Sequence, residues 1–270
     1  MEEIAEMLQR ILKKAHMTSK SLTKKNDVCP ICQDTTWVET ENGFKRCKCY
    51  KKKLLERLWK GFGVDPNKVK KLNSYEAYND LPATQEAKEK AINYIKNFKD
   101  IRLTENNSFG LFGQPGAGKS HIVIAIGAAL LNQNIQVVYM PYLEVLRELE
   151  ANRFDNEYYL KISDRYKRPK VLIIDDLFKD KVRNGELAKD KYGNRASLTE
   201  SDIKHIMPIL NCRYQNSLPT IFSTECTPSL LVELDEALEG RIMESCQDNY
   251  TVFKGKEYNY RMRKFMKKED

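Results

Sequence analysis

The chain has 270 residues, of which 41% are hydrophobic and 31% charged, and its formal net charge is +8 at pH 7. This length accommodates one large domain, or one domain and a small module, with a sizeable buried core. No apolar run approaches the roughly 20 residues that a membrane-spanning helix needs, so we expect no membrane partner. The first residues are acidic and lack the apolar core of a signal peptide, which predicts a cytoplasmic protein.

The positive charge is concentrated at the two ends of the chain. Residues 1–80 hold 17 Lys and Arg against 11 Asp and Glu, and residues 254–270 hold 7 against 3. Residues 81–253 are nearly balanced. Basic ends favour a polyanionic partner, and nucleic acid before a membrane surface. Solvated lysine faces are the alternative for any single basic run.

The chain begins with a predicted amphipathic helix over residues 2–15. Its apolar residues recur on one helix face, at Ile4, Met7, Leu8, Ile11 and Leu12. Polar, turn-prone sequence follows and separates this helix from the rest of the chain. We therefore interpret residues 1–26 as a partner-binding helix and linker, with docking onto the protein's own body as the alternative.

Four cysteines form two close pairs separated by a stretch long enough for a β-hairpin. They are Cys29, Cys32, Cys47 and Cys49. Thiolates in this pattern can surround a tetrahedral zinc ion, and in a reducing cytosol such pairs bind metal more often than they form disulfides. No further side chain indicates an open coordination position, so the pattern predicts structural zinc. Four unmetallated thiols are the alternative.

The segment Lys45–Lys60 is strongly basic and contains Tyr50 and Trp59. Basic and aromatic side chains together fit single-stranded nucleic acid, although a solvated helix fits this composition equally well. We predict a zinc-ribbon module with a basic helix over residues 27–60, and a linker over residues 61–74.

The most specific motif is a complete match to the phosphate-loop pattern G-x-x-x-x-G-K-[ST]. It consists of Gly113, Gln114, Pro115, Gly116, Ala117, Gly118, Lys119 and Ser120. An apolar run precedes it, and an uncharged helical stretch begins at His121, which is the context this loop requires. Its backbone N–H groups would cradle a polyphosphate at the positive end of the helix. Lys119 would neutralise phosphate oxygens and Ser120 would ligate Mg²⁺, so the motif predicts a nucleoside-triphosphate site.

A second apolar run, residues 171–174, ends in two carboxylates, Asp175 and Asp176. Burying a charge without a partner costs on the order of several kcal/mol, so acids at the end of a buried strand indicate a function. After a phosphate loop, this pattern is typical of the metal- and water-binding strand of P-loop ATPases. Asp175 would hold Mg²⁺ through water, and Asp176 would orient or deprotonate the attacking water.

Two later features are predicted from composition. Residues 179–198 are polar and contain glycine, which indicates a mobile insert. Pro208 lies inside an otherwise helical pattern and should kink or split that helix. Residues 219–225 form a predicted strand that ends in polar groups.

In this order, the phosphate loop, the paired acids, the polar-ended strand and a late Gly-Arg-Ile at residues 240–242 resemble AAA+ ATPases. With the Cys-Pro-x-Cys ribbon and the Leu-x₃-Leu-x-Gly-Arg-Ile segment, nearly the whole chain resembles the DnaC/DnaI-type helicase loaders of bacteria and phages. The resemblance implies an α/β fold with a P-loop AAA+ core at residues 75–270. In that core a central parallel sheet is flanked by helices, and the amino-terminal helix and zinc ribbon precede it.

The resemblance also implies roles for individual residues. In chain order they are a first sensor of the γ-phosphate at Thr224 or Glu225, an arginine finger for a neighbouring subunit's nucleotide at Arg241, and a second sensor at Arg261, with Arg263 as the alternative. Residues 141–168 occupy the place of a helical element that contacts single-stranded DNA in the family.

The function that follows is an ATP-dependent loader that self-associates and places a hexameric replicative helicase on DNA. Weak ATP turnover is expected from the isolated monomer, because Asp176 is shorter than the usual glutamate and the finger comes from a neighbour. An IstB-like transposition helper ATPase is the main alternative. A small-molecule kinase is disfavoured by the acid pair and the basic ends, and a non-hydrolysing adaptor would not need Asp176.

Overall fold

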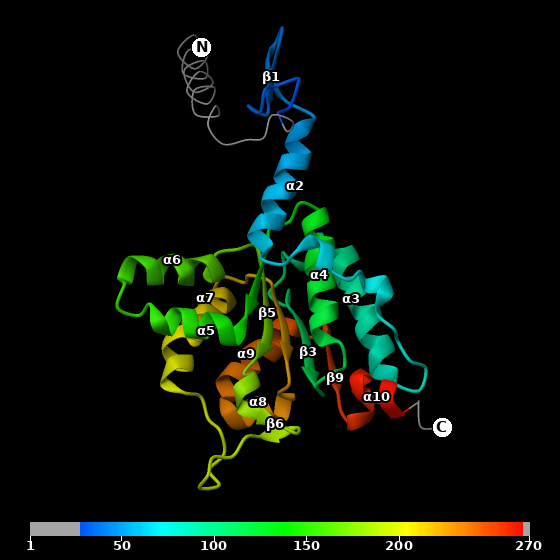
Figure 1. Ribbon diagram of the computed structural model, residues 1–270, viewed down its shortest axis with the longest axis vertical. Helices are drawn as coiled ribbons and strands as arrows, with labels where there is room; N and C mark the ends of the chain where they lie inside the picture. Colours follow the sequence, from blue (N-terminus) through cyan, green and yellow to red (C-terminus); the bar gives the residue numbers. More distant parts are fainter. Residues whose placement is uncertain (1–27, 267–270) are drawn as a thin grey trace. The chain divides into compact units, whose positions relative to one another are not determined.

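The computed structural model describes residues 28–266, with side chains described as far as residue 263 (Figure 1). The helix expected within residues 1–26 lies outside the described residues. The chain forms two compact units, with the boundary between Arg57 and Leu58. The expected linker at 61–74 therefore belongs to the second unit, because Phe62 is fully buried there and Leu72 packs against the same core. Gly127 accommodates this packing, since a Cβ at that position would lie 2.9 Å from the Phe62 ring.

The first unit is built on a β-hairpin. Strands β1 (Trp37–Thr40) and β2 (Gly43–Arg46) pair antiparallel. Helix α2 (Cys49–Phe62) begins three residues after β2 and continues into the second unit. The two cysteine pairs flank the hairpin, as the spacing predicted.

The second unit contains a parallel five-stranded sheet in the order β4-β5-β8-β3-β9. This confirms the predicted central parallel sheet. Its strands are β3 (Phe109–Gly113), β4 (Val137–Pro141), β5 (Val171–Leu177), β8 (Thr220–Thr224) and β9 (Tyr250–Phe253). Every neighbouring pair runs parallel, so the carboxyl ends of β3, β5 and β8 meet at one edge.

Helices cover both faces of this sheet (Figure 1). On β5, Ile173 packs into a cluster with α3 (Pro82–Ile101) and α4 (Lys119–Asn132), whereas Leu172 and Ile174 face the other cluster. That second cluster includes α5 (Tyr142–Ala151), α6 (Asn156–Lys167), α7 (Met207–Gln215), α8 (Pro228–Leu234) and α9 (Glu236–Cys246). Burial on both faces explains why β5 is a continuous apolar run.

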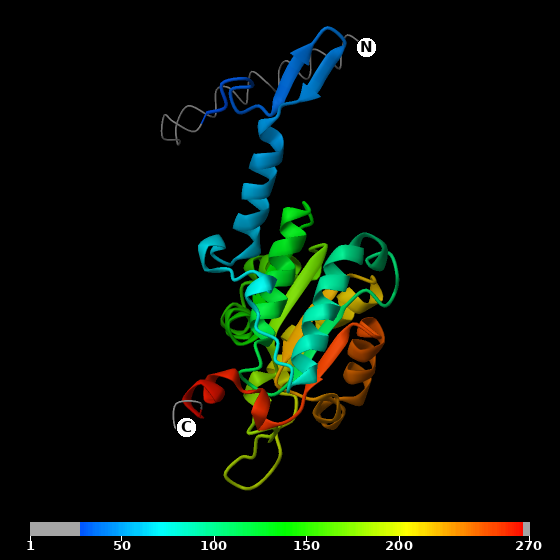
Figure 2. The same cartoon turned by 90° about the vertical axis from the view of Figure 1, so that its right-hand side faces the viewer.

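The stretch expected to be a mobile insert is partly ordered, and its loop extends beyond the carboxyl edge of the sheet (Figure 2). A 3-10 turn, η4 (Lys179–Lys181), leads into the short hairpin β6 (Val182–Arg183) and β7 (Glu186–Leu187). The Lys181 ammonium is buried and lies 2.8 Å from the Asp202 carboxylate. This ion pair fixes the base of the insert, which composition alone could not show.

The remaining elements are short. They are the 3-10 turns η2 (Pro66–Lys68), η3 (Leu72–Ser74) and η6 (Lys256–Tyr258), the π-helical turn η5 (Asp202–Ile206) and helix α10 (Tyr260–Met266). The π-helical turn η5 runs directly into α7 at Met207, one residue before Pro208, so the chain stays helical there and the hydrogen-bonding pattern changes beside the proline. Among residues 28–266, no helix combines the length and apolarity that crossing a bilayer would demand.

Candidate nucleotide site and candidate metal centre

A cavity of about 590 Å³ lies beside the phosphate loop at the carboxyl edge of the sheet. Residues 115–121 form one wall, and residues between Lys70 and Thr84 form another. Asp176 with Lys179, Glu225, and the segment that includes Arg261 complete the lining. Residues from five separate stretches therefore meet in one cleft, which we call the nucleotide cleft.

The phosphate loop is held in shape from two sides. Gly116 and Gly118 have φ angles of +79° and +85°, which favour glycine. A Cβ at Gly116 would lie 2.3 Å from the Asn259 amide oxygen, and one at Gly118 would lie 2.6 Å from the Tyr75 ring. The Tyr75 hydroxyl also donates a hydrogen bond to the Ala117 carbonyl at 3.0 Å. These contacts leave no space for a side chain at either glycine.

Lys119 is nearly buried and lies along the loop that precedes it. Its Nζ donates to the carbonyl oxygens of Gly113, at 2.7 Å, and Gln114, at 2.8 Å. Burial lowers the pKa of Lys119 to about 8, although nearby carboxylates, Glu225 foremost, oppose this shift.

Asp175 and Ser120 lie in direct contact although they are far apart in sequence. The Asp175 carboxylate accepts hydrogen bonds from the Ser120 hydroxyl, at 2.9 Å, from the Tyr139 hydroxyl, at 2.7 Å, and from Ser223. Only 6% of the Asp175 surface is exposed. A hydroxyl next to a carboxylate provides the hard oxygen ligands that Mg²⁺ prefers, so these two residues fit the metal.

Asp176 lines the nucleotide cleft and has a positive φ of 58°. Its backbone N–H donates to the Ser223 hydroxyl at 3.0 Å. Its carboxylate lies 2.5 Å from the ammonium of Lys179, which also lines the cleft. Sequence reasoning missed Lys179 because a lysine in a polar stretch resembles a solvated side chain.

The structure separates the two candidates for the first sensor. Glu225 lines the nucleotide cleft. Thr224 is fully buried, and its hydroxyl donates to the Leu177 carbonyl at 2.6 Å and accepts from the Cys226 N–H at 3.0 Å. Thr224 is therefore engaged inside the protein and does not line the cleft.

Arg261 and Arg263 both line the cleft, but their surroundings differ. Arg261 is exposed. Arg263 pairs with Asp80, Nη2 to Oδ2, at 2.5 Å and lies 4.7 Å from the Tyr78 ring centre. Its Nη1 is buried and has no hydrogen-bond partner among the described residues. A buried donor that is still unsatisfied makes Arg263 the better candidate for the second sensor.

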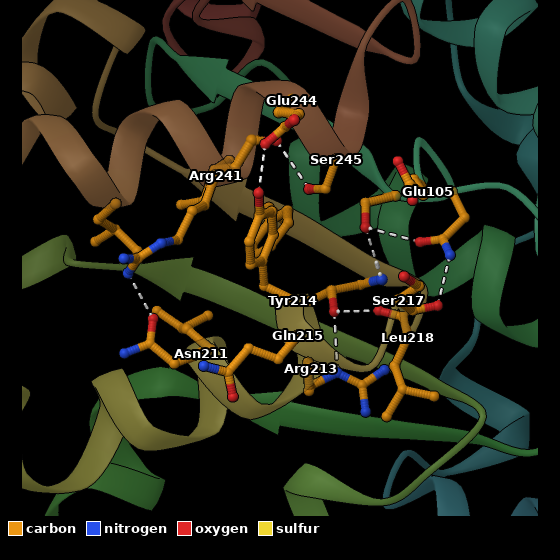
Figure 3. Close-up of a pocket in the computed structure, with 17 residues that line it drawn as sticks. Glu105, Asn211, Arg213, Tyr214, Gln215, Ser217, Leu218, Arg241, Glu244 and Ser245 are labelled. Atoms are coloured by element: carbon orange, nitrogen blue, oxygen red, sulfur yellow. Dashed lines mark hydrogen bonds between the residues drawn. The ribbon is translucent and has the colours of Figure 1, made fainter.

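Arg241 lies outside the nucleotide cleft. It lines a different hollow, of about 250 Å³, at the amino end of β3 and β8 (Figure 3). Its Nη1 donates to the Asn211 side-chain oxygen at 2.8 Å, and its guanidinium lies 6.0 Å from the Tyr214 ring centre. The structure therefore does not bring Arg241 together with the other candidate catalytic residues of its own chain.

The four cysteine sulfurs of the first unit lie within 4.8 Å of one another. The sulfurs of Cys29 and Cys47 are 3.8 Å apart, and those of Cys32 and Cys49 are 3.3 Å apart. Tetrahedral zinc with Zn–S bonds of about 2.3 Å separates its sulfurs by about 3.8 Å, so the donor set fits zinc. A disulfide would require about 2.05 Å.

The electrostatics of the four thiols also favour a cation. The backbone N–H groups of Cys32 and Ile31 lower the pKa of Cys29 to about 6, which favours its thiolate. Burial, followed by the neighbouring sulfurs, raises the pKa of Cys49. Four sulfurs at this spacing cannot all ionise unless a positive charge lies between them.

The sheet order and the cleft define the class of protein: the chain is an ATP-binding P-loop ATPase with an AAA+ core. A family model described as IstB-like ATP binding protein matches residues 63–189. The chain is 30% identical over 245 residues to the phage-like element PBSX protein XkdC of Bacillus subtilis (strain 168). This alignment covers 87% of this chain and 86% of XkdC. It is 33% identical over 230 residues to YqaM of the same strain, covering 84% of this chain and 68% of YqaM. The chain therefore belongs to the same family as XkdC and YqaM, and its residues 63–189 match the IstB-like ATP-binding model.

Two solved structures share the fold. One is a crystal structure of the DnaC helicase loader, which is 20% identical with a TM-score of 0.52. The match covers 74% of this chain and 99% of the DnaC chain. The other is AMPPCP-bound DnaA from Aquifex aeolicus, which is 16% identical with a TM-score of 0.52. The match covers 77% of this chain and 56% of the DnaA chain. At these identities the similarity concerns the fold alone.

Proposed function

We propose that this ATPase loads a hexameric replicative helicase onto DNA. The observation that carries the proposal is the combination of an ATPase core with a separate four-cysteine module. ATP hydrolysis needs only the core, so an additional module held by its own thiol cluster serves to bind a partner. We assign helicase binding to this module together with residues 1–26.

The residues of the cleft would divide the work of hydrolysis. Lys119 and the loop N–H groups bind the phosphates, and Ser120 with Asp175 holds Mg²⁺, which neutralises charge on the phosphate oxygens when bound. Asp176 orients the attacking water. Glu225, Arg261 and Arg263 line the same cleft and are the sensor candidates with access to it.

Arg241 would complete this site in a neighbouring copy of the chain. Its position away from its own cleft is what an arginine acting between subunits requires. At Gly240, next to it on α9, an added Cβ would meet no atom within 4 Å. A helical glycine that nothing in its own chain requires is consistent with close approach of another subunit. We therefore propose self-association through this surface.

Single-stranded DNA is the proposed second partner, through residues 141–168. Phe154 is 87% exposed, and the Arg153 guanidinium lies 4.7 Å from its ring centre. Tyr158, near the start of α6, is also exposed. Exposed aromatic rings beside cationic groups can stack with bases and contact phosphates.

The pKa of Lys119 predicts how nucleotide affinity depends on pH. The pKa of this lysine is about 8 in the free cleft, and a bound polyphosphate would raise it. Affinity should then be constant below about pH 8 and fall by up to about tenfold per unit above it, with proton uptake on binding. Calorimetry of a non-hydrolysable ATP analogue in two buffers of different ionisation enthalpy measures both effects. Affinity that does not change between about pH 7 and about pH 9 would contradict the assignment.

Co-purification tests the choice of partner. The full chain, with ATP and without, is mixed with a candidate hexameric helicase or with a transposase, and the mass of each complex is measured. We expect a helicase complex whose stability depends on ATP. A complex with the transposase alone would replace the loader by the second candidate, a transposition helper, which the IstB-like family match favours.

A further inference from the structure

Lys179 connects two of the acidic residues that line the nucleotide cleft, Asp176 and Glu225. Its Nζ lies 2.5 Å from Asp176 Oδ2 and 3.6 Å from Glu225 Oε1. It extends from η4, immediately after β5, and its side chain is 43% exposed. All three residues line the cleft beside the phosphate loop. One ammonium group therefore serves two carboxylates in the space next to the phosphate-binding residues.

This arrangement restricts the residue that would act on water. The Lys179 ammonium occupies part of the accepting capacity of Asp176 Oδ2 and holds the carboxylate in place, which leaves it less available to orient water. Burial alone would lower the pKa of Lys179, but Asp176 and then Glu225 outweigh it and raise that pKa. Lys179 therefore stays charged at neutral pH and holds Asp176.

A triphosphate entering the cleft adds negative charge within reach of the same lysine. Lys119 is already engaged by two backbone carbonyls, whereas Lys179 is partly exposed and has a flexible four-carbon side chain. A γ-phosphate would compete with Asp176 and Glu225 for the Lys179 ammonium. ADP lacks this group and would compete much less.

We propose that Lys179 is a positioning residue that exchanges partners, binding Asp176 and Glu225 without a γ-phosphate and turning to the γ-phosphate when ATP is present. The exchange frees the Asp176 carboxylate to orient water only in the triphosphate state. This proposal rests on the ATP site described above and adds a cation from within the same chain.

The test compares affinities of the purified full chain for a non-hydrolysable ATP analogue and for ADP, with Mg²⁺, by competition against a fluorescent nucleotide. Lys179→Met should lower the affinity for the analogue about tenfold, which corresponds to the loss of one charge-assisted hydrogen bond. It should change the affinity for ADP less than about twofold. Glu225→Gln should have the opposite effect and increase the preference for the analogue. Lys179→Arg should restore most of the preference.

Lys191→Met is the matched control, because Lys191 is exposed in the same insert and does not line the cleft. It should leave both affinities unchanged. The proposal is overturned if Lys179→Met leaves the ratio of the two affinities unchanged, or if Glu225→Gln reduces that ratio. A wild-type chain that binds neither nucleotide would instead refute the ATP site, and loss of helicase binding with an intact affinity ratio would refute only the loader. If Lys179→Met does not fold, the affinity ratios of Lys179→Arg and Glu225→Gln test the proposal instead.

Discussion

Replacing Arg241 by alanine is expected to lower ATP turnover of the assembled protein by about a thousandfold or more while leaving ATP affinity within about twofold. Arg241 lies in a hollow apart from its own nucleotide cleft, so its loss cannot disturb the contacts of Lys119 or Asp175. Its guanidinium would instead stabilise the charge that develops on the phosphoryl group bound to a neighbour. Turnover is measured at a protein concentration that gives assembly, and affinity by competition with a fluorescent nucleotide.

Asn211→Ala is the matched control for this variant, because it removes the hydrogen bond that Arg241 makes within its own chain. It should affect turnover far less, since the guanidinium remains available to a neighbour. Unchanged turnover in Arg241→Ala would show that the finger assignment is wrong.

Removing metal from the four-cysteine cluster is expected to unfold the first unit and to leave nucleotide binding intact. Structural zinc contributes about 10 to 16 kcal/mol in small modules, more than a short hairpin can replace by packing. In Cys47→Ser, amide exchange over residues 28–57 should become fast, while the second unit keeps its protection and its affinity for ATP. Zinc content, measured on the same sample, should fall from about one ion per chain to none.

Cys212→Ser provides the comparison, because Cys212 is a free thiol outside the cluster. It should retain both zinc and amide protection. A Cys47→Ser protein that remains protected over residues 28–57 would show that the thiols need no metal. Helicase binding should be lost only with the folded module, which separates the roles of the two units.

The sequence was informative where the chemistry is encoded locally. The phosphate loop contains its own glycines, lysine and serine, and the acid pair directly follows an apolar run. The meeting of Ser120 with Asp175 also follows from the sequence, because parallel strands bring their carboxyl ends to one edge. The clustering of the two cysteine pairs could also be predicted, because a hairpin brings its two ends, and so the pairs that flank it, side by side.

The sequence was not informative where a side chain's role depends on distant neighbours. Lys179 and Lys181 are two residues apart in one polar stretch, yet one faces the cleft and the other is buried against Asp202. Arg213 is 1% exposed and donates to the carbonyl oxygens of Pro169 and Pro219, at 3.0 and 2.7 Å. Such contacts are set by packing between elements that are far apart along the chain, and no local pattern records them.

Mixing two inactive variants tests most directly whether ATP is held in one chain and completed by another. Arg241→Ala keeps its own cleft but offers no finger, and Asp176→Asn offers a finger but cannot orient water. Each variant alone should be nearly inactive. A mixture of the two should recover a substantial fraction of wild-type turnover, because the intact cleft of an Arg241→Ala chain can then be completed by Arg241 of an Asp176→Asn chain. If the mixture stays as inactive as its components while both variants still bind ATP and assemble, the shared site that we propose does not exist.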